Sequence, residues 1–336
     1  MFEGILKKMI SELNSPINYF LDMGGDFIHI NQCIGKILSI DNIGSQCLNC
    51  YNDLPIFRQG FCKSCFFESP AVGDWIMRPE LSKAHLNQQD RDLEYEKKIQ
   101  LQPHIVYLAL SSHLKVGVTR KSQLPTRWID QGAHEAMILL EVPNRYLAGI
   151  AEVALKEIFS DKTNWRKMLQ NESEPVDWED SFNKAIGHLS NEFKPFINPK
   201  KKDFEKFEFP VNNYPQKVNS LNLSKTSFYK GRLTGVRGQY LLFEDQTVFN
   251  VRSNEGQKVK LNIRKAGTLV PAFFLILNNL DRIEENMLKM INKITLLILF
   301  AISTIFISSC RQEEQNRVLN YEKGVYLGKK DTKLSE

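Results

Sequence analysis

Two C-x-x-C pairs constrain the fold of this chain more than any other feature of its sequence. The first pair is Cys47 and Cys50, the second is Cys62 and Cys65, and eleven residues separate them. Two such knuckles can place four thiolates on one ion, and four thiolates complete the tetrahedral shell of Zn²⁺. A redox pair is the alternative, but no thioredoxin-like βαβ pattern surrounds these cysteines. The spacing therefore predicts a structural zinc ribbon at residues 47–65.

The remaining cysteines, Cys33 and Cys310, have no partner at motif spacing. Four of the six cysteines thus lie in C-x-x-C pairs, which favours metal binding over a disulfide framework. Because free thiols persist in a reducing compartment, we expect residues 1–263 to reside in the cytoplasm. The 336 residues predict two or three domains, and 42% hydrophobic residues suffice for packed cores. A net charge of +5 is compatible with nucleic acid or acidic lipid as a partner but selects neither. The N-terminus carries an early acid and no long apolar run, so no signal peptide is expected.

Two separate parts of the chain have a β-like pattern. Residues 15–46 alternate apolar and polar side chains around Gly24-Gly25, a pattern typical of antiparallel strands joined by a tight turn. We therefore expect an N-terminal β module with the zinc ribbon at residues 1–79, and a second small β module at residues 226–263. Their similar patterns suggest that the two modules complete one sheet. Charged sequence without glycine or proline before Pro103 predicts a connecting helix at residues 80–103.

The middle of the chain predicts an α/β unit at residues 104–170. Two apolar runs at hairpin spacing, a short helix, a third strand and an amphipathic helix give the order β-β-α-β-α. These elements are expected at residues 105–110, 114–119, 125–129, 136–142 and 146–159. A helix at residues 178–192 and a loop-rich stretch with solvated lysines at 200–202 form the linker 171–225. The fold class is therefore α+β.

The residues of this unit resemble the GIY-YIG nuclease superfamily. In that family a strand tyrosine, a second strand with a glycine, a helical arginine and a helical glutamate surround one divalent metal ion. By position, Tyr107 corresponds to the first motif, Lys115-Val116-Gly117 to the second, Arg127 to the phosphate-binding arginine and Glu152 to the metal ligand. The resemblance implies metal-dependent cleavage of phosphodiesters with Mg²⁺ or Mn²⁺.

Two positions depart from that family. Lys115 replaces the tyrosine of the second motif, and Ile105 replaces the glycine of the first. The alternative interpretation makes Tyr107 an ordinary strand residue and leaves Arg127 and Glu152 as solvated surface charges.

The order of segments from residue 28 to residue 263 is also similar to the bacterial domain-of-unknown-function family 2797. The resemblance rests on the cysteine pairs, on Lys115-Val116-Gly117-Val118-Thr119, on the run from Arg127 to Ala133, and on Gly238-Gln239-Tyr240-Leu241. It implies an order of domains but no activity. The run from Arg127 to Ala133 looks site-like, although Trp128 is more typical of a core.

The sequence changes character after Ile263. Residues 294–310 are nearly continuously apolar and would form a hydrophobic helix of about 26 Å, the lower limit for a membrane span. The same run followed by Cys310 resembles a lipoprotein signal peptide, so residues 264–336 are also interpreted as a second reading frame fused to the body. If the chain is made as written, this helix would tether a cytoplasmic body to the inner membrane.

Together these patterns predict a zinc-containing nucleic-acid-binding protein, with metal-dependent nuclease activity as its chemistry. The alternative is a non-catalytic module that keeps the fold and binds protein or RNA. Expected cofactors are structural zinc and a catalytic Mg²⁺ or Mn²⁺, without a small-molecule cofactor. The candidate residues are Tyr107, Lys115, Arg127 and Glu152 for catalysis and Cys47, Cys50, Cys62 and Cys65 for zinc.

Overall fold

The computed structural model describes residues 1–199 and 203–265. One compact unit spans residues 1–267. The expected hydrophobic helix at 294–310, Cys310 and the lysines at 200–202 lie outside the described residues. Among the residues that the structure describes, no helix is long and apolar enough to cross a membrane.

A seven-stranded sheet joins the two ends of the described chain. Its strands follow the order β1-β14-β5-β11-β12-β13-β10. Their bounds are β1 Phe2–Ile5, β5 Ile37–Ser45, β10 Asn219–Leu221, β11 Phe228–Arg237, β12 Tyr240–Phe243, β13 Thr247–Asn250 and β14 Gln257–Arg264. Ile40 of β5 lies opposite Tyr229 on one side and Leu261 on the other. The expectation that the two β modules complete one sheet is therefore confirmed for β1 and β5, whereas the other strands of the N-terminal module form a sheet of their own.

A three-stranded sheet packs beside the larger one. It comprises β2 Ile10–Glu12, β3 Asn18–Asp22 and β4 Phe27–His29 in that order. Met23 N–H donates to Asp26 O at 2.9 Å, and Gly24 adopts a positive φ of 84° in the turn between β3 and β4. The predicted hairpin around the two glycines is confirmed.

The middle of the chain forms a four-stranded sheet in the order β7-β6-β8-β9. The strands are β6 His104–Leu110, β7 Leu114–Arg120, β8 Glu135–Val142 and β9 Phe204–Lys206. Helix α4 Thr126–Asp130 connects β7 to β8, and helix α5 Arg145–Leu155 follows β8. The predicted order β-β-α-β-α is confirmed. Strand β9 comes from the stretch expected to be loop-rich, because three residues are too few to carry a periodic signal. Strand β10 was missed for the same reason.

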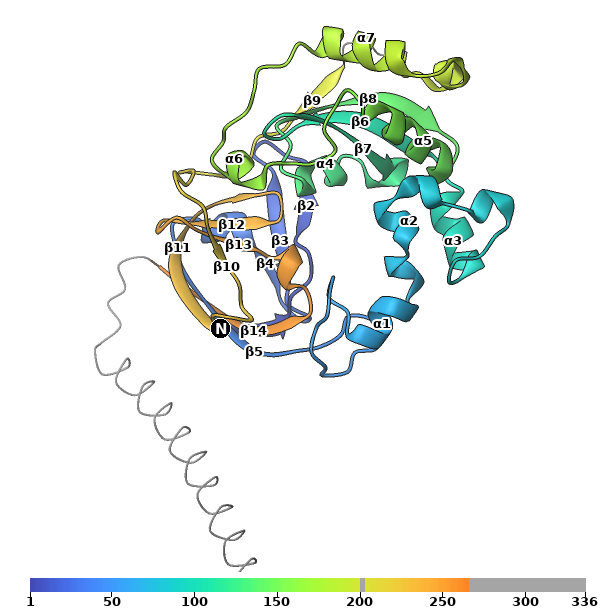
Figure 1. Cartoon of the computed structure of the whole chain (residues 1–336). Helices are drawn as coiled ribbons and strands as arrows, with labels where there is room; N and C mark the ends of the chain where they lie inside the picture. The colour runs from blue at the N-terminus through green and yellow to red at the C-terminus, as the bar shows by residue number, and fades with distance from the viewer. Residues whose placement is uncertain (200–202, 266–336) are drawn as a thin grey trace, which may run out of the picture. The chain divides into compact units, whose positions relative to one another are not determined.

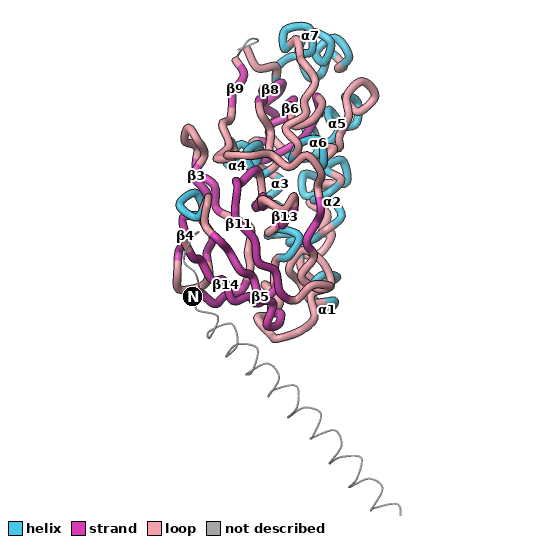
Figure 2. Tube along the Cα trace, turned by 90° about the vertical axis from the view of Figure 1, so that its left-hand side faces the viewer, coloured by secondary structure: helices cyan, strands magenta, loops and turns pink. Residues whose placement is uncertain are grey.

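The two faces of the four-stranded sheet bury different cores. Tyr107 on β6 and Trp128 on α4 belong to the core that is shared with the seven-stranded sheet. Val106 and Leu108 face the core formed with α5 and α7 Trp178–His188. Alternation along β6 thus sends successive side chains to opposite cores. Figures 1 and 2 show α5 and α7 on the outer side of this sheet, away from the seven-stranded sheet.

The prediction of a connecting helix at residues 80–103 is wrong for the first half of that range. Helix α3 spans only Leu93–Gln100, and the preceding segment forms single 3₁₀ turns at Pro79–Leu81 and Ala84–Leu86. Asn87 adopts a left-handed φ of 59°, which a continuous helix cannot contain. The N-terminus of α3 is capped by Asp92, whose side chain accepts from Tyr95 N–H at 2.9 Å.

The remaining helical elements are short. They are α1 Lys63–Glu68, α2 Asp74–Met77, α6 Trp165–Leu169, and 3₁₀ turns at Ile30–Cys33, Pro70–Val72, Lys121–Gln123, Asn191–Phe196 and Arg252–Asn254. Helix α1 carries Cys65, and α1 to α3 lead from the cysteine segment to β6 (Figure 1).

Candidate functional site

The four predicted cysteines come together in the structure. Their sulfur atoms all lie within 4.8 Å of one another, and Sγ of Cys50 is 4.0 Å from Sγ of Cys62. A tetrahedral zinc–thiolate centre needs sulfur atoms about 3.8 Å apart, given Zn–S distances of about 2.3 Å. The cluster can therefore hold a metal ion, and its donor set suits structural zinc.

Local backbone structure positions these sulfur atoms. The first pair follows β5, and the second pair lies at the start of α1. Backbone N–H groups of Asn49 and Cys62 approach Sγ of Cys47 at 3.5 and 3.3 Å. Burial opposes ionisation of Cys47, but hydrogen bonds from the backbone N–H groups of Cys50, Cys62 and Asn49 outweigh it and lower its pKa to about 6. A thiolate favoured in this way is the form that binds metal.

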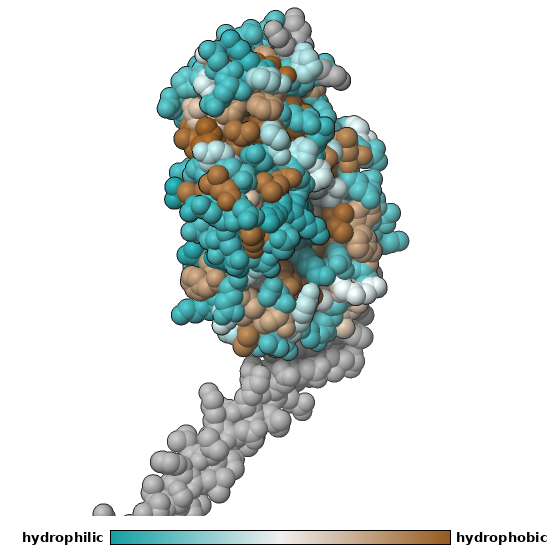
Figure 3. Space-filling view, turned by 90° about the vertical axis from the view of Figure 1, so that its right-hand side faces the viewer, coloured by the Kyte–Doolittle hydropathy of each residue, from teal (hydrophilic) through white to brown (hydrophobic). Residues whose placement is uncertain are grey.

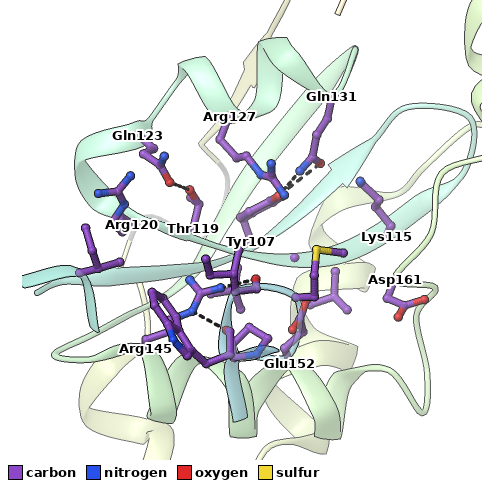
Figure 4. Close-up of a pocket in the computed structure, with 18 of the residues that line it drawn as sticks. Tyr107, Lys115, Thr119, Arg120, Gln123, Arg127, Gln131, Arg145, Glu152 and Asp161 are labelled. Atoms are coloured by element: carbon purple, nitrogen blue, oxygen red, sulfur yellow. Dashed lines mark hydrogen bonds between the residues drawn. The ribbon is translucent and has the colours of Figure 1, made fainter. Parts of the chain in front are cut away.

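The four candidate catalytic residues line a second site, a cavity of about 500 Å³ at the edge strand β7. Every residue from Lys115 to Arg120 contributes to its wall. Because successive strand residues point to opposite faces, the cavity runs along the strand edge and reaches both faces of the sheet. Figure 4 shows Arg127 and Gln131 on one side of β7, and Arg145 and Glu152 on the other.

Tyr107 is fixed at the centre of this wall. Its hydroxyl exchanges hydrogen bonds with the Gln131 amide at 3.0 and 3.2 Å. Burial raises its pKa, although Arg127 acts against that rise. Gly117 lies directly across from it on β7, and a Cβ atom there would sit 2.6 Å from the tyrosine hydroxyl. Gly117 therefore makes room for the Tyr107 side chain.

Lys115 is a buried amine, only 7% exposed. Burial and the nearby Arg127 lower its pKa to about 8, whereas Glu152 and Asp161 raise it. The neutral form of this amine is therefore more populated near physiological pH than that of an ordinary surface lysine.

Glu152 is only 8% exposed, so it is not the solvated surface charge of the alternative interpretation. Its Oε2 lies 3.5 Å from Nζ of Lys156, the residue that directly follows α5. Burial raises the pKa of Glu152, while Lys156 opposes that rise. The Glu152 carboxylate therefore lines the cavity but is already paired with the Lys156 ammonium group.

Sequence reasoning missed the other charged residues of the cavity. Arg145 is tied in place by Nε and Nη2, which donate to Trp75 O at 3.0 Å and Ile76 O at 2.7 Å. The further charged lining residues are Arg120, Lys156, Asp161, Lys162 and Arg252. No single motif joins these residues because they come from distant segments. The helical spacing of Arg127 and Gln131 could have suggested that both face one side of α4.

The run from Arg127 to Ala133 divides between site and core. Arg127 and Gln131 line the cavity, whereas Trp128 is 1% exposed and packs edge-to-face on Tyr107. Asp130 faces away and accepts from Lys8 Nζ at 3.0 Å. The interpretation of Trp128 as a core residue is confirmed.

The fold and the two sites define an α+β protein with a four-cysteine cluster able to hold a metal ion and a separate basic cavity. The chain belongs to the family described as protein of unknown function (DUF2797), whose model matches residues 35–259. No curated protein and no solved structure matches the chain.

Proposed function

We propose that this protein binds nucleic acid in the cavity at β7, and that a divalent ion held by Glu152 makes it a phosphodiester hydrolase. The excess of cations in the cavity carries this proposal. Seven lysine or arginine side chains line it, against two carboxylates. Such an excess attracts polyanions and neutralises phosphate groups. The cationic residues are Lys115, Arg120, Arg127, Arg145, Lys156, Lys162 and Arg252.

The side chains of the cavity suit different roles. Arg127 would contact a phosphate oxygen, because a guanidinium matches phosphate geometry. Tyr107 stays protonated, since burial raises its pKa, and so would orient a phosphate or water as a donor. Lys115, whose pKa is lowered to about 8, is better suited to accept a proton from water. Lys115, which stands in place of the tyrosine of the second motif, would then act as the general base.

A carboxylate oxygen such as that of Glu152 is the ligand type preferred by Mg²⁺ and Mn²⁺. When bound, such an ion would supply Lewis-acid stabilisation of charge on the phosphate. Lys156 currently pairs with this carboxylate, so metal binding would have to displace it. Zinc is the metal we infer for the four-cysteine cluster, where its role would be structural.

A non-catalytic nucleic-acid-binding module is the second candidate. The ion pair between Lys156 and Glu152 favours it, as does the origin of Glu152 and Arg127 on helices that pack against different faces of the sheet. In that case the lysine and arginine side chains would bind phosphate, and no metal ion would bind in the cavity at β7.

The test incubates the full-length, zinc-loaded protein with labelled DNA and RNA, single- and double-stranded, in EDTA, Mg²⁺ or Mn²⁺. Binding and cleavage are followed separately. Glu152→Gln should abolish metal-dependent cleavage yet leave binding unchanged, because it removes a metal ligand while keeping the shape of the side chain. Arg127→Gln should weaken binding as well, since a phosphate contact acts before the reaction begins.

Glu157→Gln is the matched control, because Glu157 follows α5 but its side chain is 71% exposed and pairs with His188. It should behave as wild type. Binding without cleavage in every metal would replace the hydrolase by the binding module. Absence of both binding and cleavage would refute the proposed function.

A further inference from the structure

A second cavity, of about 690 Å³, lies beside the four-cysteine cluster. Phe57, Arg58 and Phe61 line it from the loop between the two cysteine pairs. Asn250, Arg252 and Ser253 line it from the end of β13 and the turn that follows. Arg252 also lines the cavity at β7. The two cavities therefore meet at one exposed arginine side chain.

The loop presents an aromatic ring that is held in place yet open to a ligand. Phe57 is 43% exposed. Its ring packs on Phe66 at a centroid distance of 5.3 Å and on Phe67 at 5.7 Å. The guanidinium carbon of Arg58 lies 5.4 Å from the same ring centroid. Because cysteine pairs flank this loop at both ends, a bound metal would hold the ring and its arginine in one position.

The cationic groups of this region are available to a ligand. Arg58 and Arg252 are exposed, and neither makes a salt bridge within the part of the chain that the structure describes, although Arg252 attracts Glu255, the carboxylate that lines this cavity. Aromatic faces combined with unpaired arginines are the features by which proteins hold single-stranded nucleic acid. Paired bases cannot use such a ring, because their faces are already stacked on their neighbours in the duplex.

Phe57 and Phe67 are both exposed and in ring contact, so the loop carries a small apolar patch. On the side of the molecule that carries α1, α2 and α3, hydrophilic surface surrounds separate hydrophobic patches (Figure 3). Stable protein interfaces need a larger, continuous apolar centre, so a protein partner fits less well.

We propose that this second cavity binds unpaired nucleotides of the strand whose phosphate occupies the cavity at β7. Arg252 contacts the backbone between the two cavities, and a base stacks on Phe57. The substrate is therefore single-stranded nucleic acid or a duplex with a single-stranded flank. This inference rests on the proposed function, because it concerns the same bound strand.

The test measures binding of the full-length, zinc-loaded protein to a fluorescent single-stranded 20-mer and to its duplex. Phe57→Leu keeps an apolar side chain against Phe66 but removes the stacking face, and Arg252→Gln removes the charge. Each should weaken single-strand binding at least about fivefold, the effect of losing one stacked base or one phosphate contact. Duplex binding should change less than about twofold for Phe57→Leu. A 5-iodouracil base in the single strand should crosslink to the peptide that contains Phe57.

Two variants serve as controls. Phe27 is 62% exposed and packs on Phe20, so Phe27→Leu removes a comparable ring elsewhere. Arg232→Gln removes an arginine that pairs with Glu244 and lines neither cavity. Zinc content and melting temperature confirm that each variant is folded.

The outcomes separate this inference from the proposed function. If wild type binds nucleic acid but Phe57→Leu binds single strands as tightly as wild type does, the inference is overturned. Equal weakening of single-strand and duplex binding by Phe57→Leu would also overturn it. If wild type binds no nucleic acid at all, the proposed function itself fails, and this inference fails with it.

Discussion

At the residue scale, His104 illustrates how burial sets the charge of a side chain. It begins β6 and is fully buried. Its Nδ1 lies 2.7 Å from Gln102 O, while Nε2 has no hydrogen-bond partner. Burial lowers its pKa to about 4, and the charges of Arg145 and Arg120 act in the same direction. The ring is therefore neutral, with its proton on Nδ1.

This burial predicts a loss of stability on acidification. An unfolded histidine titrates near pH 6.5, so between pH 6.5 and about 4 the unfolded state binds more protons than the folded state. The free energy of unfolding must then fall as the pH falls through this window, by on the order of 2 kcal/mol for this residue. Chemical denaturation from pH 7 to pH 4.5 measures the effect.

His104→Asn is the informative variant, because an amide can still donate to Gln102 O but does not titrate. In this variant the free energy of unfolding should fall less between pH 7 and pH 4.5 than it does in wild type. The rest of the fall should persist, since burial also lowers the pKa of His134 to about 4. His188→Asn, at an exposed position, is the control. If the free energy of unfolding of the His104→Asn variant fell with pH as steeply as that of wild type, this account would be contradicted.

At the element scale, close packing of α5 on the chain that leads from the cysteine cluster forms one wall of the cavity at β7. Gly149 permits this approach, because a Cβ atom there would lie 2.2 Å from Glu80 N. Arg145, one turn earlier, secures the contact by donating to Trp75 O and Ile76 O. The helix that carries Glu152 is thus held by a segment outside the β-β-α-β-α unit.

Gly149→Ala should therefore destabilise the protein by about 1–3 kcal/mol, the usual cost of overpacking, although alanine is the better helix former. It should also weaken nucleic-acid binding by separating the two walls of the cavity. Thermal unfolding and anisotropy measure the two effects.

Gly187→Ala is the matched control on α7, where an added Cβ would meet nothing within 4 Å. There the substitution should be neutral or stabilising by up to about 1 kcal/mol. Equal effects at the two glycines would show that the approach at Gly149 is not tight.

At the scale of the whole molecule, the four-cysteine cluster joins the end of β5, in the seven-stranded sheet, to α1. The chain from α1 then continues through α2 to the wall of the cavity at β7. A metal ion in the cluster would therefore stabilise the connection between the large sheet and the remainder of the described chain.

Purified protein should contain about one zinc per chain, and Cys62→Ser should release it and lower the melting temperature, because three thiolates leave the shell incomplete. Elemental analysis and thermal unfolding measure both. Cys33→Ser is the control, since Cys33 is buried but lies outside the cluster. If freshly purified, reduced protein contained no zinc, the assignment of zinc to the four-cysteine cluster would be refuted.

The sequence by itself determined the features that depend on neighbouring residues. The cysteine knuckles, the hairpin turn at Gly24 and the order β-β-α-β-α follow from spacing and periodicity over short stretches of chain. It also identified Tyr107, Lys115, Arg127 and Glu152 as candidates, and all four line one cavity.

Only the tertiary structure decided how distant segments meet. It brings Arg145 and Arg252 to the cavity at β7, pairs β5 with β11 and β14, and buries Glu152 beside Lys156. It also adds the three-residue strands β9 and β10, whose sequences are too short to show a period. These contacts depend on packing between residues far apart in the sequence, and local patterns carry no information about which distant side chains will share a core or a cavity.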